Sequence, residues 1–222
     1  MVVINMKLNN IQNEFWNSVA EIKEFEDPFY IEQLAPFVNN NSYIIEYGCR
    51  YGRLLNLLSK HGYCNTSGFD FSAAMIAKGR NRWPRLDLQH IQHAILPLQD
   101  NSVDAAILST VLCCIPDHAS LLQVIQEIHR VVKSDGLLYL TDFLITDTEH
   151  MTGKYKKDIA AHNEWGVYQT SEGAVVRHFS PDYIERLLCD FSVQWYREET
   201  FVTMNHNSVK SFHGIYKKRD LI

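Results

Sequence analysis

Hydrophobic and polar positions follow two alternating patterns along most of the chain. Apolar β-prone runs predict strands at 43–47, 64–70, 86–92, 103–109 and 137–143. Between these runs, apolar residues at helical spacing predict helices over 51–61, 73–82 and 117–133. Strands that alternate with helices are typical of an α/β fold whose parallel sheet has helices on both faces.

The two ends of the chain follow other patterns. Residues 8–38 read as helical, with Asp27-Pro28 as a second helix start. Residues 144–179 are rich in polar and aromatic groups, and we expect them to form an inserted substrate lid at the ligand end of the sheet. Ser180-Pro181 predicts a helix over 181–189, and two strand-like runs at 191–203 and 209–216 predict a β-hairpin.

These patterns predict one domain over residues 1–222. We expect its parts to be an N-terminal helical cap, a ligand-binding core, a lid, and a C-terminal helix with a hairpin, at 1–40, 43–143, 144–179 and 180–222. A chain of 222 residues with 46% apolar residues has the length and composition of one globular domain.

Charge and cysteine content narrow the function classes. The net charge of −5 provides no basic field, which weighs against a nucleic-acid partner. The N-terminus does not read as a signal peptide, and the most apolar stretch, 103–115, is too short to span a bilayer. Five cysteines without a C-x-x-C pair favour a reduced environment. We therefore expect a cytoplasmic protein without a membrane partner.

The first predicted strand ends in a glycine turn that is typical of ligand sites. The run 43–45 meets Glu46, then Gly48 and Gly52, and a helical pattern follows. Such a turn presents backbone N–H groups and a helix N-terminus at the carboxyl end of a strand, where open α/β sheets bind ligands. Glycine lets the backbone approach a ligand closely.

A second acid follows at a spacing along the chain that is typical of nucleotide-binding βαβ units. Asp70 lies 24 residues after Glu46, at the end of the next predicted strand. In a nucleotide-binding βαβ unit, an acid about 20 residues on accepts hydrogen bonds from ribose hydroxyls. The pair Gly48 and Gly52 lacks the G-x-G-x-x-G order, which weighs against a dinucleotide-dependent dehydrogenase.

Four segments resemble motifs of the class I S-adenosylmethionine-dependent methyltransferases of small-molecule type. They are IIEYGCRYGR, GFDFSAAMI, LPLQDNSVD and EIHRVVKSDGLL, at 44–53, 68–76, 96–104 and 127–138. Their order and spacing are similar to those of the family. The resemblance implies a Rossmann-like, seven-stranded, mostly parallel sheet with an antiparallel C-terminal strand. It also implies S-adenosyl-L-methionine as cofactor and S-adenosyl-L-homocysteine as product.

The resemblance also implies cofactor-binding residues. Glu46 would orient the methionine amino end, and Asp70 would bind the ribose hydroxyls. The backbone would pass the cofactor at the two glycines, the adenine would pack on two side chains, and two backbone groups would bond its edge: respectively Gly48 and Gly52, Phe71 and Met75, Ala94 and Ile95. Further residues expected along the cofactor are Cys49, Arg50, Ser72, Ser109 and Thr110.

Arg50 departs from the family pattern, which usually has glycine there. Its side chain would either crowd the methionine end of the cofactor or point outward. If it spoils the site, the chain is a non-catalytic binding or regulatory protein of the same fold.

Candidate acceptor residues lie in the predicted lid. His178 is the candidate general base, because the pKa of histidine lies close to working pH. Arg177 would pair with an anionic group of the substrate, while Tyr155 and Tyr168 would line the pocket or, with Trp165, surround a cation. The histidines of the third strand do not have the spacing of a metal site, and we expect no metal.

Together these features predict in-line methyl transfer to an oxygen or nitrogen of a small molecule. A methyltransferase acting on protein or tRNA is the alternative that a basic stripe beside the pocket would favour. We expect a monomer or a homodimer.

Overall fold

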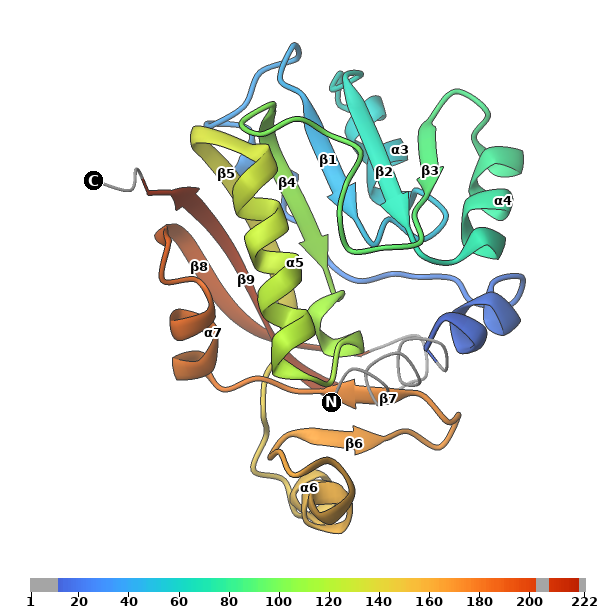
Figure 1. The fold of residues 1–222 in the computed structure, drawn as a ribbon, viewed down its shortest axis with the longest axis vertical. Helices are drawn as coiled ribbons and strands as arrows, with labels where there is room; N and C mark the ends of the chain where they lie inside the picture. The colour runs from blue at the N-terminus through green and yellow to red at the C-terminus, as the bar shows by residue number, and fades with distance from the viewer. Residues whose placement is uncertain (1–11, 203–207, 220–222) are drawn as a thin grey trace.

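The computed structural model describes residues 12–202 and 208–219. Within them, seven strands form one sheet in the order β3-β2-β1-β4-β5-β9-β8 (Figure 1). The first five are parallel, with bounds β1 (Ile44–Tyr47), β2 (Thr66–Asp70), β3 (Asp87–His90), β4 (Val103–Ser109) and β5 (Val132–Phe143). The order reverses at β1, next to β4, which is where open α/β sheets bind ligands.

In the C-terminal hairpin, the later of the two strands lies inside the sheet and the earlier one lies at its edge. β8 (Phe191–Val202) is an edge strand, and β9 (Ser208–Lys218) lies between β5 and β8, antiparallel to both. The predicted hairpin and the predicted antiparallel strand are therefore confirmed. The turn predicted around 205–207 lies outside the described residues.

Helices cover both faces of the sheet, as the alternating pattern predicts. On one face pack α5 (His118–Val131) and α7 (Pro181–Leu187), through apolar residues such as Leu121, Ile128 and Ile184. On the other face pack α3 (Arg53–Lys60) and the one-turn helix α2 (Ile31–Leu34). α4 (Ala73–Arg82) lies beside β3, against the outer part of the sheet (Figure 1).

Side-chain caps fix where α4, α5 and α7 begin. Ser72, Asp117 and Ser180 each accept a hydrogen bond from the backbone N–H three residues later. Such a cap stabilises a helix by about 1 kcal/mol. The Ser180-Pro181 pair was expected to start a helix, and α7 begins directly after Ser180.

The prediction of helix over residues 8–38 is wrong for its second half. A helix covers 12–19, but residues 23–30 are not helical, and α2 is a single turn. The residue before a proline is disfavoured in helical conformation, which opposes helix at Asp27. Tertiary contacts also hold this segment: the backbone N–H of Phe25 donates to the Tyr51 hydroxyl, and that of Tyr30 donates to the Tyr139 hydroxyl.

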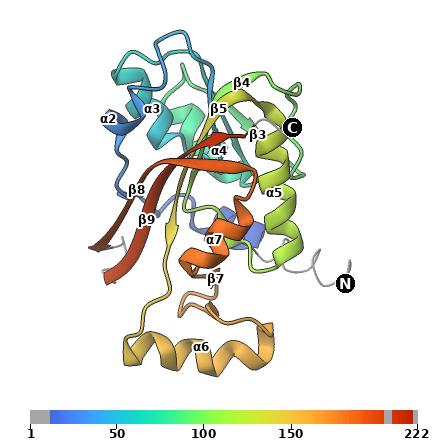
Figure 2. The same cartoon turned by 90° about the vertical axis from the view of Figure 1, so that its left-hand side faces the viewer.

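Residues 144–180 form a separate layer at the carboxyl ends of the parallel strands. It contains α6 (Glu149–His162) and a hairpin of β6 (Val167–Gln169) and β7 (Val175–Arg177). Figure 1 shows this layer below the strand arrowheads, and Figure 2 shows α6 lying across that end of the molecule. Among the described residues, no helix is long and apolar enough to cross a membrane.

Candidate cofactor and acceptor site

The loop after β1 is held against the end of β2 by its backbone. Gly48 and Gly52 have φ of 73° and 84°, a region that glycine adopts without strain. The N–H groups of Gly48 and Cys49 both donate to the Phe69 carbonyl, at 2.7 and 3.0 Å. Gly52 then forms the N-cap of α3 without a side chain. The predicted strand, glycine turn and helix are confirmed.

Asp70 connects the loops after β1 and β2. Its Oδ2 accepts the backbone N–H of Arg50, and its Oδ1 accepts that of Ser72, both at 2.7 Å. Burial raises the pKa of Asp70, and these two backbone hydrogen bonds oppose the rise. An ionised carboxylate has about four acceptor positions, so two remain for a ligand. This geometry suits the ribose-binding role that the sequence predicts for Asp70.

Glu46 is a buried carboxyl group with an unpartnered oxygen. The residue is 3% exposed, and within the described residues its Oε2 has no hydrogen-bond partner. Burial raises its pKa to about 8, although the charges of Arg50 and Arg53 oppose the rise. The Oγ of Ser109, at the end of the neighbouring β4, is likewise buried and unpartnered.

Unpartnered buried polar groups cost about 1–3 kcal/mol each, so their presence at one sheet edge needs a reason. A ligand with a cationic end would satisfy the carboxyl group of Glu46. The residues at the ends of β1, β2 and β4 therefore fit a nucleoside that carries an amino-acid end. Asp70 would hold its ribose, and Glu46 would face its ammonium group.

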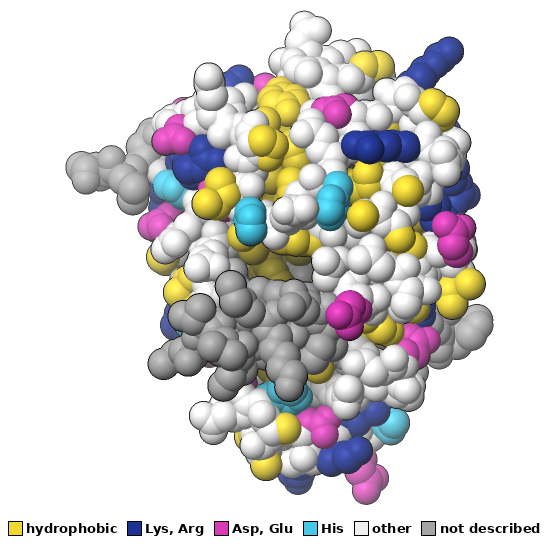
Figure 3. All heavy atoms as spheres, turned by 45° about the vertical axis from the view of Figure 1, so that its right-hand side comes forward, with side chains coloured by type: hydrophobic (Ala, Val, Ile, Leu, Met, Phe, Trp, Pro, Cys, Tyr) yellow, Lys and Arg dark blue, Asp and Glu magenta, His cyan; other side chains and the backbone are white. Residues whose placement is uncertain are grey.

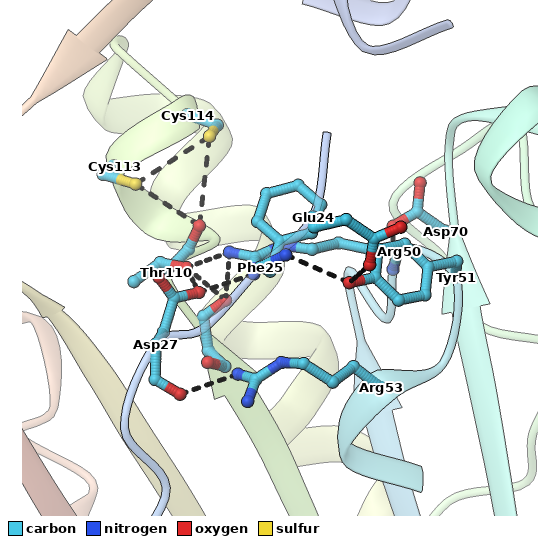
Figure 4. A network of polar contacts seen from close by, with 11 residues as sticks. Glu24, Phe25, Asp27, Arg50, Tyr51, Arg53, Asp70, Thr110, Cys113 and Cys114 are labelled. Carbon is cyan, nitrogen blue, oxygen red and sulfur yellow. Dashed lines mark hydrogen bonds and ion pairs between the residues drawn. The ribbon is translucent and has the colours of Figure 1, made fainter. Parts of the chain in front are cut away.

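Arg50 points inward over this loop (Figure 4). One guanidinium nitrogen donates to Asp27 Oδ2 at 2.6 Å, and the other donates to the Ser109 carbonyl at 3.4 Å and to the Thr110 hydroxyl. The guanidinium carbon lies 3.8 Å from the centre of the Phe25 ring. Of the two orientations expected for this side chain, the structure does not have the outward one: the guanidinium lies against Asp27 and Thr110.

The charge of Asp27 is matched by that of Arg50. Burial alone would raise the pKa of Asp27, but the charge and hydrogen bond of Arg50 more than offset it, and the pKa lies below its usual range. Thr110, with φ of 50°, places its hydroxyl between the two. The N-terminal segment thus closes over the end of β4 through an ion pair.

Neighbouring contacts fix this segment further. The Tyr51 hydroxyl donates to Glu24, which also pairs with Arg82 at 2.8 Å. Met75, predicted as an adenine contact, is 1% exposed and packs with Phe25 and Tyr51 in a small hydrophobic cluster. The structure therefore places Met75 under the N-terminal segment, as a core residue.

The other residues predicted beside the adenine lie at the surface end of the site. Phe71 is half-buried, with its ring 6.1 Å from that of Tyr47. Ala94 is also half-buried, and Ile95 is 72% exposed. Cys49 is buried and donates its thiol to the Arg50 carbonyl at 3.7 Å, so it packs the loop from below.

His178 lies between two tyrosines of the inserted layer. Its Nδ1 is 2.8 Å from the Tyr155 hydroxyl, and its Nε2 is 3.2 Å from the Tyr168 hydroxyl. Burial lowers the pKa of His178 to about 4, with a further contribution from the charge of Lys154. The imidazole is therefore neutral near pH 7. Three of the four predicted acceptor residues are in one cluster.

Arg177, the fourth, has its partners elsewhere. Its guanidinium pairs with Glu164 and donates to the Tyr183 hydroxyl at 2.7 Å, on the side of α7. It is 2% exposed, so its charge is enclosed and matched. Trp165 packs edge-on against Tyr155, with ring centres 5.3 Å apart. Although Arg177 is next to His178 in the chain, its guanidinium lies on the side of α7 and is part of neither the His178 cluster nor the cofactor loop.

The acceptor cluster approaches the end of β4 through a short 3-10 helix, η1 (Leu112–Cys114). The strand β7, which pairs with β6 at Tyr168, packs against η1. The Cys113 thiol of η1 donates to the Thr110 carbonyl at 3.3 Å. The layer that holds the tyrosine–histidine cluster therefore lies beside the strand end at which Thr110 contacts Arg50.

Sequence reasoning missed Asp27 and Phe25 as site residues. The sequence indicated Asp27 only as part of an Asp-Pro helix start, and Phe25 only as an apolar position. Arg50 was a usable signal, because an arginine in a buried glycine turn needs a counter-ion. The sequence did not show that this counter-ion lies 23 residues earlier.

The known proteins that resemble this chain include methyltransferases. A family model described as a methyltransferase domain matches residues 45–140. A probable S-adenosylmethionine-dependent methyltransferase of Mycolicibacterium smegmatis is 31% identical over 109 residues, covering 49% of this chain and 39% of that protein. A demethylmenaquinone methyltransferase of Lysinibacillus sphaericus is 35% identical over 74 residues, covering 32% of this chain and 30% of the relative. These matches span less than half the length of each relative.

Solved structures share the fold over more of the chain. A SAM-dependent methyltransferase from Methanosarcina mazei has a TM-score of 0.78 at 22% identity, covering 87% of this chain and 99% of that one. The [4+2]-cyclase SpnF has a TM-score of 0.64 at 15% identity, covering 96% and 94%. At these identities the likeness shows the fold.

Proposed function

We propose that this chain, whose residues 45–140 match a methyltransferase domain, is a class I S-adenosylmethionine-dependent methyltransferase that methylates an oxygen or nitrogen of a small molecule. The observation that carries the proposal is the pair of buried acids at the ends of adjacent strands. Asp70 is held by two backbone N–H groups, and Glu46 has an oxygen without a hydrogen-bond partner in the described part of the chain. S-adenosylmethionine is the cofactor, and when bound it supplies a methyl group activated by a positively charged sulfur.

The chain's part in the reaction is mainly alignment. Asp70 would fix the ribose, Glu46 the amino end, and the turn from Gly48 to Gly52 would let the backbone lie against the cofactor. Alignment of two reacting groups can contribute up to about 7–11 kcal/mol. The inserted layer would hold the acceptor and exclude water from the ends of β1 and β4.

His178 is the candidate base, and it acts through Tyr168. The acceptor gives its proton to the Tyr168 hydroxyl oxygen as that hydroxyl gives its own proton to Nε2 of His178. The neutral imidazole supports this role, because Nε2 is then free to accept while Nδ1–H donates to Tyr155. His178 with its lowered pKa is a weak base, which suits an acceptor whose acidity rises as the methyl group attaches.

Three observations favour a small acceptor over protein or tRNA. Demethylmenaquinone methyltransferases are among the relatives. The net charge is −5. On the described part of the face drawn in Figure 3, Lys and Arg side chains lie scattered among acidic and neutral ones, without a continuous band.

A second function rests on Arg50. If its guanidinium fills the methionine end of the cofactor site, the chain is a protein of the same fold that does not transfer methyl groups. The [4+2]-cyclase SpnF, which has a similar fold, is an example of another activity on this fold.

Calorimetric titration with S-adenosylhomocysteine tests the proposal. We expect micromolar binding that is lost in Asp70→Ala and kept in Asp87→Ala, which changes an exposed aspartate on β3. Mass spectrometry after incubation with S-adenosylmethionine and mixed small acceptors should then show a mass gain of one methyl group. No binding by the wild type would contradict the proposal.

A further inference from the structure

The ion pair between Arg50 and Asp27, at the ligand end of the sheet, has a cost in folding free energy. The two side chains are only 17% and 13% exposed, so both charges are largely removed from water. Arg50 also has φ of 55°, a conformation that costs any residue with a side chain. A buried ion pair is weak evidence for stability, because apolar residues of similar size often do as well. The position and the cost together suggest a ligand role.

The guanidinium has support that does not depend on Asp27. It lies over the Phe25 ring, with 3.8 Å between the guanidinium carbon and the ring centre, and it reaches the Ser109 carbonyl at 3.4 Å. Asp27 likewise has a second neighbour, because the Thr110 hydroxyl lies 3.4 Å from its Oδ2. Each partner would therefore stay in place if the other changed its contact.

The charges around this pair match those of an α-amino acid. The site has a cation, Arg50, next to a carboxylate, Asp27, and beside them the unpartnered Oε2 of Glu46. The amino-acid end of S-adenosylmethionine or S-adenosylhomocysteine has one ammonium and one carboxylate group. A planar guanidinium binds a carboxylate through two parallel hydrogen bonds.

We propose that Arg50 and Asp27 recognise the amino-acid end of the cofactor by exchanging partners. Arg50 leaves Asp27 and binds the carboxylate of the ligand. The ammonium group takes the acceptors that Arg50 releases, Asp27 and the Ser109 carbonyl, and gains Glu46. No charge is left unmatched, because one ion pair becomes two. This inference rests on the proposed function and assigns Arg50 and Asp27 as the specificity residues of that site.

Two ligands separate the adenosine end from the amino-acid end. S-adenosylhomocysteine carries both, whereas 5′-methylthioadenosine lacks the amino-acid end. Calorimetry would measure each against the wild type, Arg50→Gly, Asp27→Asn and the control Arg85→Ala, which removes an exposed arginine. Arg50→Gly is expected to fold, because glycine suits φ of 55°.

We expect Arg50→Gly and Asp27→Asn each to weaken S-adenosylhomocysteine binding at least about tenfold, the loss expected for a hydrogen bond to a charged group. Binding of 5′-methylthioadenosine should stay within about twofold in every variant. Unchanged or tighter S-adenosylhomocysteine binding by Arg50→Gly would overturn the exchange and show that the guanidinium only blocks the site.

The controls separate the two proposals. If the wild type binds 5′-methylthioadenosine but not S-adenosylhomocysteine, the adenosine site stands and the exchange is wrong. If the wild type binds neither ligand, the proposed function fails, and this inference fails with it.

Discussion

The two halves of the ligand end are built in different ways. The cofactor half consists of backbone turns and carboxyl groups fixed by the ends of β1, β2 and β4. The acceptor half consists of side chains from an inserted layer, with His178 between Tyr155 and Tyr168. The first half therefore depends on conformation and charge, while the second depends on hydrogen bonds between side chains that other proteins of this fold need not share.

The halves also differ in how they respond to pH. In the cofactor half, burial raises the pKa of an acid, Glu46, so the folded protein holds a proton there. In the acceptor half, burial lowers the pKa of a base, His178, so the folded protein excludes a proton. Alkali should therefore weaken one half and acid the other.

The largest expected effect is at Glu46. Its folded pKa of about 8 lies above the ordinary 4.5, so its contribution to stability is complete below pH 4.5 and lost as pH rises through 8. The loss is at most about 5 kcal/mol, since each pH unit between the two pKa values corresponds to about 1.36 kcal/mol. Urea unfolding from pH 5 to 9 should show a decline that Glu46→Gln removes and the exposed Glu185→Gln keeps. An equal decline in both variants would contradict the assignment.

His178 should produce the opposite slope. Its folded pKa of about 4 lies below the ordinary 6.5, so the folded state loses stability as pH falls from 6.5 toward 4. The loss is at most about 3 kcal/mol. His178→Gln should remove this acid dependence, whereas His150→Gln, at an exposed position in α6, should not. Titration of the His178 ring protons by NMR near pH 6.5 would show that the imidazole is not shielded as described.

A Cβ added at a glycine should lower the free energy of unfolding more in the cofactor half, at Gly48, than in the acceptor half, at Gly173. A Cβ at Gly48 would lie 2.5 Å from Cγ2 of Val111, and φ is 73°. At Gly173, in the β6–β7 turn, φ is 95°, but no atom of the described residues would lie within 4 Å of a Cβ. We expect a loss of unfolding free energy of about 3 kcal/mol at Gly48 and about 1 kcal/mol for Gly173→Ala. Thermal unfolding of the two variants would measure these losses. Equal losses would mean that the Val111 side chain moves aside for the new Cβ.

The smallest effects on stability are expected at the two tyrosines. Tyr155→Phe and Tyr168→Phe should each lower the free energy of unfolding by about 1 kcal/mol, the typical contribution of a hydrogen bond. They should differ in single-turnover methyl transfer, where we expect about a hundredfold loss for Tyr168→Phe and little change for Tyr155→Phe. Equal rates in the two variants would remove Tyr168 from the proton path.

The sequence predicted the strands and helices around the cofactor half well, because local signals determine them. Both α4 and β4 have their predicted bounds. β5 begins five residues earlier than predicted, at Val132, because it pairs with Val103 before a register shift. Such an irregularity depends on the neighbouring strand and not on the local pattern.

The remaining features depend on contacts between distant parts of the chain. Asp27 meets Arg50, and Arg177 meets Glu164 and Tyr183, through tertiary packing that periodicity does not describe. The sequence could show that Arg50 is unusual, but its direction was decided by the position of the N-terminal segment. The lid role of residues 144–179 stays a prediction.

The placement of β9 has a consequence for synthesis on the ribosome. β8 leaves the exit tunnel before β9, yet its neighbour in the sheet is β9 and not β5. While β9 is still in the tunnel, β5 has one unpaired edge and β8 has no partner in the sheet. The nascent chain therefore exposes strand edges until β9 emerges.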